Sequence, residues 1–362
     1  MNQDVQNFPS EAELSLLPRP VCLQQAILLS LSYLDALGIA PTAYEVWRCL
    51  PKWQASYGEV YRLLQTDPLL KTVTHRDRGH LSLRNLEHIE QRIQRGKVSE
   101  FKWRRARSTA ALLSLVPFVT SISVANTVSM GVAKPTSDVD LLITVQPGRM
   151  WTARMLVTGV VFGFGRFRRK SHVANRMCLS FYLADDALNL QPLALAGDDP
   201  YLAHWIASLG PVWERRGWSL GHALALANPW TQALMPNLAP QRPSDRRRVP
   251  AAVDSTTQPL RLLAEKILGG PRGDRLEVRL RTRQLHRMQK TAPTELRTPT
   301  QHIVISDSVL KFHEQDRRTW FRERTIATYR RLLAGELPQL SNEQPELSTA
   351  GLVIQPVGAT VS

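Results

Sequence analysis

Apolar residues in the first part of the chain recur every three to four positions, which is the spacing of helices that pack on one face. Two shorter apolar runs follow, separated by a polar turn, as in a β-hairpin. The predicted elements are helices over 21–37, 41–50 and 57–66 and paired strands over 69–74 and 80–83. Three helices followed by a β wing predict a winged-helix-like unit over residues 20–85.

Winged-helix-like units often bind DNA through their third helix. Here that helix carries one glutamate and one arginine, Glu59 and Arg62, and it therefore lacks a strongly basic face. The predicted wing is more basic, with Arg76 and Arg78 at its turn. The pattern favours a unit that packs on the rest of the protein over one that binds DNA, and both interpretations stay open.

A long polar helix is predicted over 86–117, where Pro117 ends it. The helix is rich in arginine and lysine, and Phe101 and Trp103 lie among the charges. Such a mixture can bind a nucleic-acid strand. In a connecting helix, however, the aromatic residues more often pack inward. The pattern favours a connecting helix.

The next stretch, 118–145, is predicted to form a strand, a polar turn with a short helix, and a second strand. Asp138 and Asp140 open that second strand. Because side chains alternate across a strand, both carboxylates lie on one face and can bind one hard cation, Mg²⁺ or Mn²⁺. The alternative is a solvent-facing strand start, and an Asp-x-Asp pattern alone favours that alternative.

The rest of the chain mixes helical and strand spacing. We predict a helix over 149–164, a strand over 177–183, a tryptophan-rich helical segment over 201–227, a linker over 241–258, helices over 260–268 and 274–290, a strand over 303–305, and a helix over 317–333. Beyond residue 335 the periodicity is lost, which predicts a disordered tail over 336–362.

Composition narrows the class of protein. The chain has 362 residues, and its 43% hydrophobic content is enough to bury cores in two or three domains. A formal charge of +15 favours anionic partners such as nucleotides or nucleic acid. Three cysteines without paired spacing, and no signal sequence, predict a reduced, cytoplasmic protein. No membrane span is expected, because the longest apolar segment, 150–164, is short and contains Arg154.

Eleven positions separate Thr127 from Asp138, with an apolar strand on each side. This segment resembles the nucleotidyltransferase superfamily of DNA polymerase β type, in which a Gly-Ser at a strand end precedes a short helix and an Asp-x-Asp strand. Asn126 and Thr127 stand at the Gly-Ser position. The resemblance implies that Asp138 and Asp140 bind the catalytic metal. It also implies that the nucleotide-binding residues are Asn126, Thr127, Ser137, Lys134 and Arg154.

Two features depart from that motif. Asn126 replaces a glycine whose missing side chain lets phosphate approach the backbone. Asparagine tolerates left-handed dihedral angles, so we expect the turn to survive with a narrower phosphate seat. The superfamily commonly places a third carboxylate on the strand predicted over 177–183, yet that strand contains no acid, and Asp185 and Asp186 follow its end.

A closer resemblance, over about residues 22–330, is to bacterial nucleotidyltransferase-domain proteins of undefined substrate. It rests on the order of the segments Gly148–Arg154, Cys178–Leu183, Ala227–Trp230 and Met235–Asn237 around the Asp-x-Asp motif. In that group the strand usually carries Cys-Leu-Asn, and Ser180 departs from the asparagine.

The resemblance implies an α/β (α+β) nucleotidyltransferase fold core over 118–240. An N-terminal winged-helix-like unit and a C-terminal basic helical region over 259–335 are expected to flank it.

The function expected from this resemblance is Mg²⁺-dependent transfer of a nucleoside monophosphate from a nucleoside triphosphate to a hydroxyl acceptor. One alternative is a catalytically lapsed protein of the same fold that binds nucleotide or nucleic acid as a regulatory module. Another is a DNA-binding regulator that uses Arg76 and Arg78 of the wing.

Overall fold

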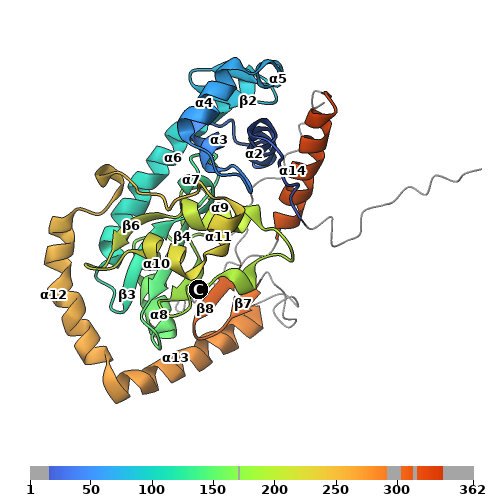
Figure 1. The fold of residues 1–362 in the computed structure, drawn as a ribbon. Helices are drawn as coiled ribbons and strands as arrows, with labels where there is room; N and C mark the ends of the chain where they lie inside the picture. Colours follow the sequence, from blue (N-terminus) through green and yellow to red (C-terminus); the bar gives the residue numbers. More distant parts are fainter. Residues whose placement is uncertain (1–15, 170–171, 292–302, 313–315, 337–362) are drawn as a thin grey trace, which may run out of the picture.

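A six-stranded sheet crosses the centre of the molecule, with helices on both faces (Figure 1). The computed structural model describes residues 16–169, 172–291, 303–312 and 316–336. The strands are β3 (Val119–Val124), β4 (Val139–Val145), β5 (Met177–Ala184), β6 (Gly210–Glu214), β7 (Ile303–Ile305) and β8 (Val309–Phe312). The order is β6-β3-β4-β5-β8-β7, and only the central β4–β5 pair is parallel. The expectation of a mixed α/β protein is therefore confirmed.

Alternate residues of β4 point to opposite faces and belong to two different cores. Leu141 and Ile143 pack on one face with α6 (Leu86–Leu113), α8 (Met150–Gly163) and α13 (Gly270–Thr291). Leu142 packs on the other face with α9 (Pro200–Ser208) and α10 (Leu220–Ala227). Burial on both faces explains why the strand is almost continuously apolar in sequence.

The N-terminal unit contains α2 (Leu23–Ala36), α3 (Ala43–Arg48), α4 (Tyr57–Thr66), α5 (Pro68–Val73), β1 (His75–Asp77) and β2 (His80–Ser82). Capping boxes begin α3 and α4, because Thr42 and Ser56 each exchange hydrogen bonds with the glutamate three residues later. The strand predicted over 69–74 is wrong: Asp67 caps α5 and Pro68 fits its first turn. The hairpin is consequently shorter than predicted.

The C-terminal segments are distributed over the molecule. The apolar face of α14 (Arg318–Leu333) packs on α2 and joins the core of the N-terminal unit, through residues such as Phe321 and Tyr329. Strands β7 and β8 extend the central sheet beside β5. The region expected as a unit over 259–335 therefore contributes to both cores.

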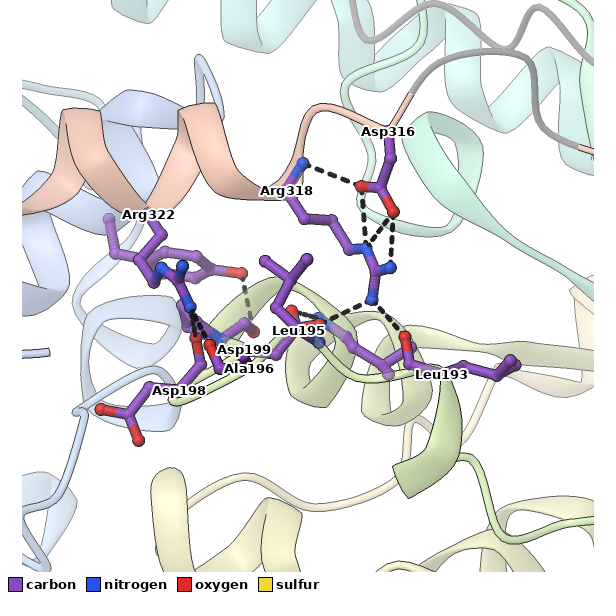
Figure 2. Close-up of polar contacts among 11 residues, drawn as sticks. Leu193, Leu195, Ala196, Asp198, Asp199, Asp316, Arg318 and Arg322 are labelled. Atoms are coloured by element: carbon purple, nitrogen blue, oxygen red, sulfur yellow. Dashed lines mark hydrogen bonds and ion pairs between the residues drawn. The ribbon is translucent and has the colours of Figure 1, made fainter. Parts of the chain in front are cut away.

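Two arginines of α14 hold a loop of the core in place. The Arg318 side chain pairs with Asp316 on one side and with Asp199 on the other, at 2.5 and 2.6 Å, and it donates to the Leu193 carbonyl (Figure 2). Arg322 donates to the carbonyls of Ala196 and Asp198 (Figure 2). These contacts join α14 to the segment that leads into α9.

Two predicted segments differ in the structure. The helical segment expected over 201–227 is interrupted by β6, which pairs antiparallel with β3. The linker expected over 241–258 ends in α12 (Ala251–Leu268), which contains Pro259. The short elements that complete the fold are α7 (Asn126–Ser129), α11 (Trp230–Leu234), η1 (Gln191–Leu193) and η2 (Asp245–Arg247).

Polar contacts, and not an apolar stripe, hold α12 to the core. The Arg261 guanidinium stacks over the Trp213 ring at 4.9 Å and donates to the Ser114 carbonyl. The Trp213 indole N–H in turn donates to Asp254 at 3.0 Å. An inner face of this kind has no hydrophobic periodicity, which explains why sequence patterning missed the first half of the helix.

Among the described residues, no helix is long and apolar enough to cross a membrane. The tail expected to be disordered, over 336–362, lies outside the described residues except for its first residue, Glu336.

Candidate functional site

The structure brings Asp138 and Asp140 together at the start of β4. Asp138 immediately precedes the strand, Asp140 lies within it, and their exposed fractions are 0% and 3%. Cys178 of β5 stands directly opposite Asp140 in the parallel register. One potential ligand atom from each of the three side chains lies within 4.8 Å of the other two. The solvent-facing alternative for this strand start is therefore wrong.

Arg168 supplies positive charge to this cluster. Its Nε lies 3.1 Å from a carboxylate oxygen of Asp138, and its guanidinium donates to the Cys178 sulfur at 3.6 Å. The bridge between Phe167 and Met177 holds this part of the loop against the first residue of β5. Arg168 lies in the loop between α8 and β5, and the fold places its side chain on the Asp138 carboxylate.

Asp140 is the electrostatically strained member of the pair. Burial, followed by the negative charge of Asp138, raises the pKa of Asp140 well above its usual range, and the Asn126 side chain, followed by the charge of Arg168, opposes part of that rise. Neither carboxylate oxygen accepts a hydrogen bond of good geometry from the described residues. Two carboxylates enclosed in this way attract a cation strongly.

The donor set suits a hard cation. Burial and the two aspartates raise the pKa of the Cys178 thiol, so the thiol is protonated when no metal is bound. The carboxylate oxygens of Asp138 and Asp140 are the kind of ligand that Mg²⁺ and Mn²⁺ prefer. Asp138 and Asp140 thus fit the metal expected from the sequence, and Cys178 lines their site.

The turn that follows β3 has the left-handed backbone expected at Asn126. Asn126 adopts a left-handed conformation with φ of 53°, which asparagine tolerates, and its side-chain oxygen accepts a hydrogen bond from the Trp205 indole at 2.8 Å. The backbone N–H of Ala125 donates to the Asp140 carbonyl, which joins the turn to the aspartate strand. The buried Thr127 hydroxyl has no hydrogen-bond partner among the described residues.

Ser137 and Lys134 stabilise the loop that leads to the aspartates. The Ser137 hydroxyl and backbone N–H both donate to the Lys134 carbonyl. Buried Lys102 donates to the carbonyls of Ser137 and Pro135, and burial lowers its pKa to about 8, with Asp138 opposing that change. The Lys134 side chain is half-buried. Lys102, in the helix predicted from the sequence as a connecting helix, therefore anchors this loop.

Arg154 does not join the site. Its guanidinium donates to Gln284 of α13 and lies 5.4 Å from the centre of the Phe312 ring. Phe312 belongs to the core that includes Leu141, on the opposite face of the sheet from Asp140. The expectation that Arg154 binds nucleotide is therefore corrected, because the alternation of the strands separates it from the carboxylates.

No described acid takes the place of the third carboxylate. Cys178 and Ser180 occupy the part of β5 beside Asp140, whereas Asp185 follows the far end and its N–H donates to the Val145 carbonyl. Seven residues of strand separate Asp185 from Cys178, which corresponds to about 23 Å. Asp185 and its neighbour Asp186 are therefore too distant to bind a metal held by Asp140.

Lys311 is a charged residue of this face that sequence reasoning missed. It pairs with Phe181 in the register, and its neighbours Leu310 and Phe312 point to the other core. The side chain thus projects on the same face as Asp140, two strands away, and it is 9% exposed. Burial, followed by the charge of Arg318, lowers its pKa to about 8. A lysine between apolar residues in a strand was the sequence signal.

The loop between α8 and β5 lines a small pocket together with Phe162 of α8. The pocket has a volume of about 230 Å³ and is bounded by Phe162, Gly165, Phe167, Arg169, His172 and Arg176. The Arg176 carbonyl accepts a hydrogen bond from Val139, the residue between the two aspartates.

The wing of the N-terminal unit is less basic than its sequence indicates. Arg78 forms ion pairs with Asp77 and with Glu90 of α6. Arg76 donates to Thr74 and to the Leu70 carbonyl. The DNA-binding alternative depended on Arg76 and Arg78, and both side chains form contacts within the protein.

Comparisons with protein-family models, with curated proteins and with solved structures gave no match to this chain.

Proposed function

We propose that this protein is a Mg²⁺- or Mn²⁺-dependent nucleotidyltransferase, which transfers a nucleoside monophosphate from a nucleoside triphosphate to a hydroxyl acceptor and releases pyrophosphate. The observation that carries the proposal is the buried pair Asp138 and Asp140, placed side by side after a left-handed turn at Asn126. The strand, short helix and strand that contain them support the nucleotidyltransferase fold that the sequence resemblance implies.

Each residue of the site has a defined task in this proposal. Asp138 and Asp140 hold the divalent cation, which neutralises charge on the phosphates. The Thr127 hydroxyl, which is buried without a partner, donates to a phosphate oxygen. Because Arg168 lies on Asp138, its side chain moves aside or pairs with the phosphates when nucleotide binds.

Turnover is expected to be slow. A positioned general base contributes roughly 10²–10⁴-fold to a proton transfer. Beside Asp140, β5 offers the Cys178 thiol and the Ser180 hydroxyl, and neither is an efficient base near neutral pH. The acceptor hydroxyl must therefore be deprotonated by water, by an acidic residue outside the described part of the chain, or by a partner.

A second candidate function is a lapsed nucleotidyltransferase-fold protein that binds nucleotide or nucleic acid as a regulatory module. The observation that favours it is the ion pair between Arg168 and Asp138, since a guanidinium can replace the cation that a catalytic pair needs. The asparagine at position 126 and the lack of a third carboxylate on β5 are consistent with the same interpretation.

Calorimetric titration tests the first requirement of the enzyme proposal. The protein is titrated with non-hydrolysable ATP, GTP, CTP and UTP analogues, with Mg²⁺, with Mn²⁺ and with chelator. We expect metal-dependent binding of at least one analogue, and its loss in the variant Asp138→Asn, Asp140→Asn. Asp186→Asn is the matched control, because Asp186 is exposed at the other end of β5.

Turnover distinguishes the two candidates. Release of pyrophosphate from a nucleoside triphosphate, dependent on metal and on both aspartates, supports the enzyme. Binding that persists in the double variant, without pyrophosphate release, supports the regulatory module. Absence of binding to all four analogues would overturn the enzyme proposal.

A further inference from the structure

Helix α12 reverses the usual pattern of a surface helix, because a charged residue faces the core and apolar residues face the solvent. Its charged residue Arg261 is 1% exposed and faces the core, and the Glu265 side chain beside it is 12% exposed. Leu260, Leu263 and Ile267, at the helical spacing i, i+3 and i+7, are 61%, 55% and 66% exposed. A stripe of large apolar residues on the solvent side is unusual, and such patches commonly mark an interaction site.

The helix that follows adds positive charge to this surface. Arg272, Arg275, Arg279 and Arg283 repeat at i, i+3, i+7 and i+11 on the exposed side of α13. None of these four guanidinium groups forms an ion pair with another described residue. The inner side of α13 is occupied differently, because Leu280 and Met288 are buried against the core that contains α8.

Few negative charges offset the arginines. Asp274 pairs with Arg149 at 2.6 Å. Glu277 accepts hydrogen bonds from the first backbone N–H groups of α8, at 2.7 and 2.9 Å, and so caps that helix. In Figure 1, α12 and α13 form adjoining borders of the molecule, at its left and lower edges, so their outer sides meet at a corner. Lys266 and Ile267 lie on the α12 side of that corner, and Arg272 lies on the α13 side.

We propose that the outer face of α12 and α13 docks on a membrane surface that contains anionic phospholipid. Exposed leucine and isoleucine side chains enter the boundary between headgroups and acyl chains, and the neighbouring arginines bind the phosphates. The apolar part of the surface argues against nucleic acid as the partner, and the basic part argues against a second copy of this chain. A nucleic acid gains little from Leu260, Leu263 and Ile267, and a second copy of this chain would bring a second row of arginines against the first.

Vesicle co-sedimentation with the full chain tests the proposal. The probes are vesicles of phosphatidylcholine alone and of equal parts phosphatidylcholine and phosphatidylglycerol. We expect binding to the mixed vesicles, weakening as salt is raised, and little binding to phosphatidylcholine. The variant Arg272→Gln, Arg275→Gln should lose roughly 25-fold in partition coefficient, since each basic residue near an anionic surface contributes about fivefold.

The apolar half has its own variant. Leu263→Ser, Ile267→Ser should weaken binding roughly tenfold or more, at unchanged thermal stability because both side chains are exposed. The controls are Leu226→Ser, whose side chain is 70% exposed on α10, and Arg330→Gln, Arg331→Gln on α14. Both controls should bind vesicles as the unmodified protein does.

Three outcomes would overturn the proposal. The first is no binding to mixed vesicles, or equal binding to both kinds. The second is equal loss in the control variants. The third is evidence for a different partner. A dimer seen in light scattering, which the Leu263→Ser, Ile267→Ser variant converts to a monomer, would show that a second copy of the chain covers the surface. Binding of a DNA duplex that is tighter than vesicle binding, and that Arg272→Gln, Arg275→Gln abolishes while vesicle binding persists, would show that the partner is nucleic acid.

Discussion

The Arg168 guanidinium lies 3.1 Å from the Asp138 carboxylate and also contacts the Cys178 sulfur. A positive side chain thus occupies one side of a buried acidic pair that is otherwise suited to a divalent cation. The arginine and a metal compete for the same carboxylate charge, so the strength of this ion pair affects how readily the site binds metal.

Replacing Arg168 should lower the stability of the metal-free protein and make its stability depend more strongly on bound metal. In Arg168→Gln, removing one partner of a buried ion pair leaves Asp138 with less compensation, and we expect the metal-free protein to lose about 3 kcal/mol of unfolding free energy. Mn²⁺ or Mg²⁺ should then raise the melting temperature more in the variant than in the unmodified protein. Thermal unfolding with and without each metal measures both effects.

The control for this experiment is Arg169→Gln, the neighbouring arginine, which stacks on Phe162. It should change neither stability nor metal response by a comparable amount. If metal stabilises Arg168→Gln no more than the unmodified protein, competition between Arg168 and a cation is excluded.

Neutralising Asp140 should stabilise the metal-free protein. The residue is buried beside Asp138, and both effects raise its pKa because they disfavour the charged form. We expect Asp140→Asn to gain about 0.5–2 kcal/mol of unfolding free energy in chelator, as commonly occurs when strain is removed from a functional site. Denaturant unfolding checks this, and a loss of stability would show that the Asp140 carboxylate has a structural role.

The aspartate pair could be predicted from sequence because its geometry is local. Asp138 and Asp140 are two residues apart on a strand, and period-2 alternation alone places them on one face. The turn at Asn126 follows from the same short segment, since asparagine accepts the left-handed backbone that the structure shows. The neighbouring strand β5 was likewise predictable from its apolar run.

Contacts between distant segments could not be predicted in this way. Arg154 is only 14 residues from Asp140, yet the sheet separates them, because α8 covers the face opposite the carboxylates. Glu277 caps α8 from 126 residues away, and no local pattern announces such a partner. Helix α12 was missed in part because its buried side is polar, which reverses the rule on which periodicity depends.

Close packing in the core gives a sensitive test of the sheet. A Cβ added at Gly210 of β6 would overlap the ring of Trp103, which is buried and donates to the Val128 carbonyl at 3.2 Å. We expect Gly210→Ala to destabilise the protein by about 1–3 kcal/mol, the usual range for overpacking. The matched control is Gly217→Ala, where no atom lies near the added carbon but the backbone φ is positive. Denaturant unfolding of the two variants compares the free-energy cost of steric overlap at position 210 with the cost of backbone strain at position 217.

Asp185 should make stability fall as the pH rises. Burial raises its pKa to about 6, although a hydrogen bond from Thr120 opposes the change. The folded state therefore holds its proton more tightly than the unfolded chain, where the pKa is about 4. The contribution is fully present below pH 4 and declines between about pH 4 and 6, by about 1–2 kcal/mol because solvent screens this partly exposed carboxyl group.

Asp185→Asn should remove this slope and stabilise the protein at pH 7, because an amide still accepts the hydrogen bond from Thr120. The comparison is Asp186→Asn, at the exposed position beside it. Unfolding free energies measured from pH 4 to 7 test the prediction, and an unchanged slope in Asp185→Asn would contradict it.

The ion pairs around Arg318 should give the opposite dependence in acid (Figure 2). Burial alone works to raise the pKa of Asp316, but hydrogen bonds and the charge of Arg318 outweigh it and lower the pKa to about 2. The stabilisation is present above the unfolded pKa of about 4 and is lost as the pH falls from about 4 to 2. Asp316→Asn should therefore lose about 2–3 kcal/mol at pH 7 and show a weaker acid dependence.

Arg318→Met should be more damaging than Asp316→Asn, because it leaves Asp199 as well as Asp316 without the guanidinium, at exposed side-chain fractions of 1% and 9%. The matched substitution is Arg330→Met, at an exposed position of the same helix. Since Arg318 joins α14 to the loop before α9, its loss should also increase amide hydrogen exchange in that loop. Equal stability and equal exchange in the two methionine variants would show that this pairing does not hold the C-terminal helix to the core.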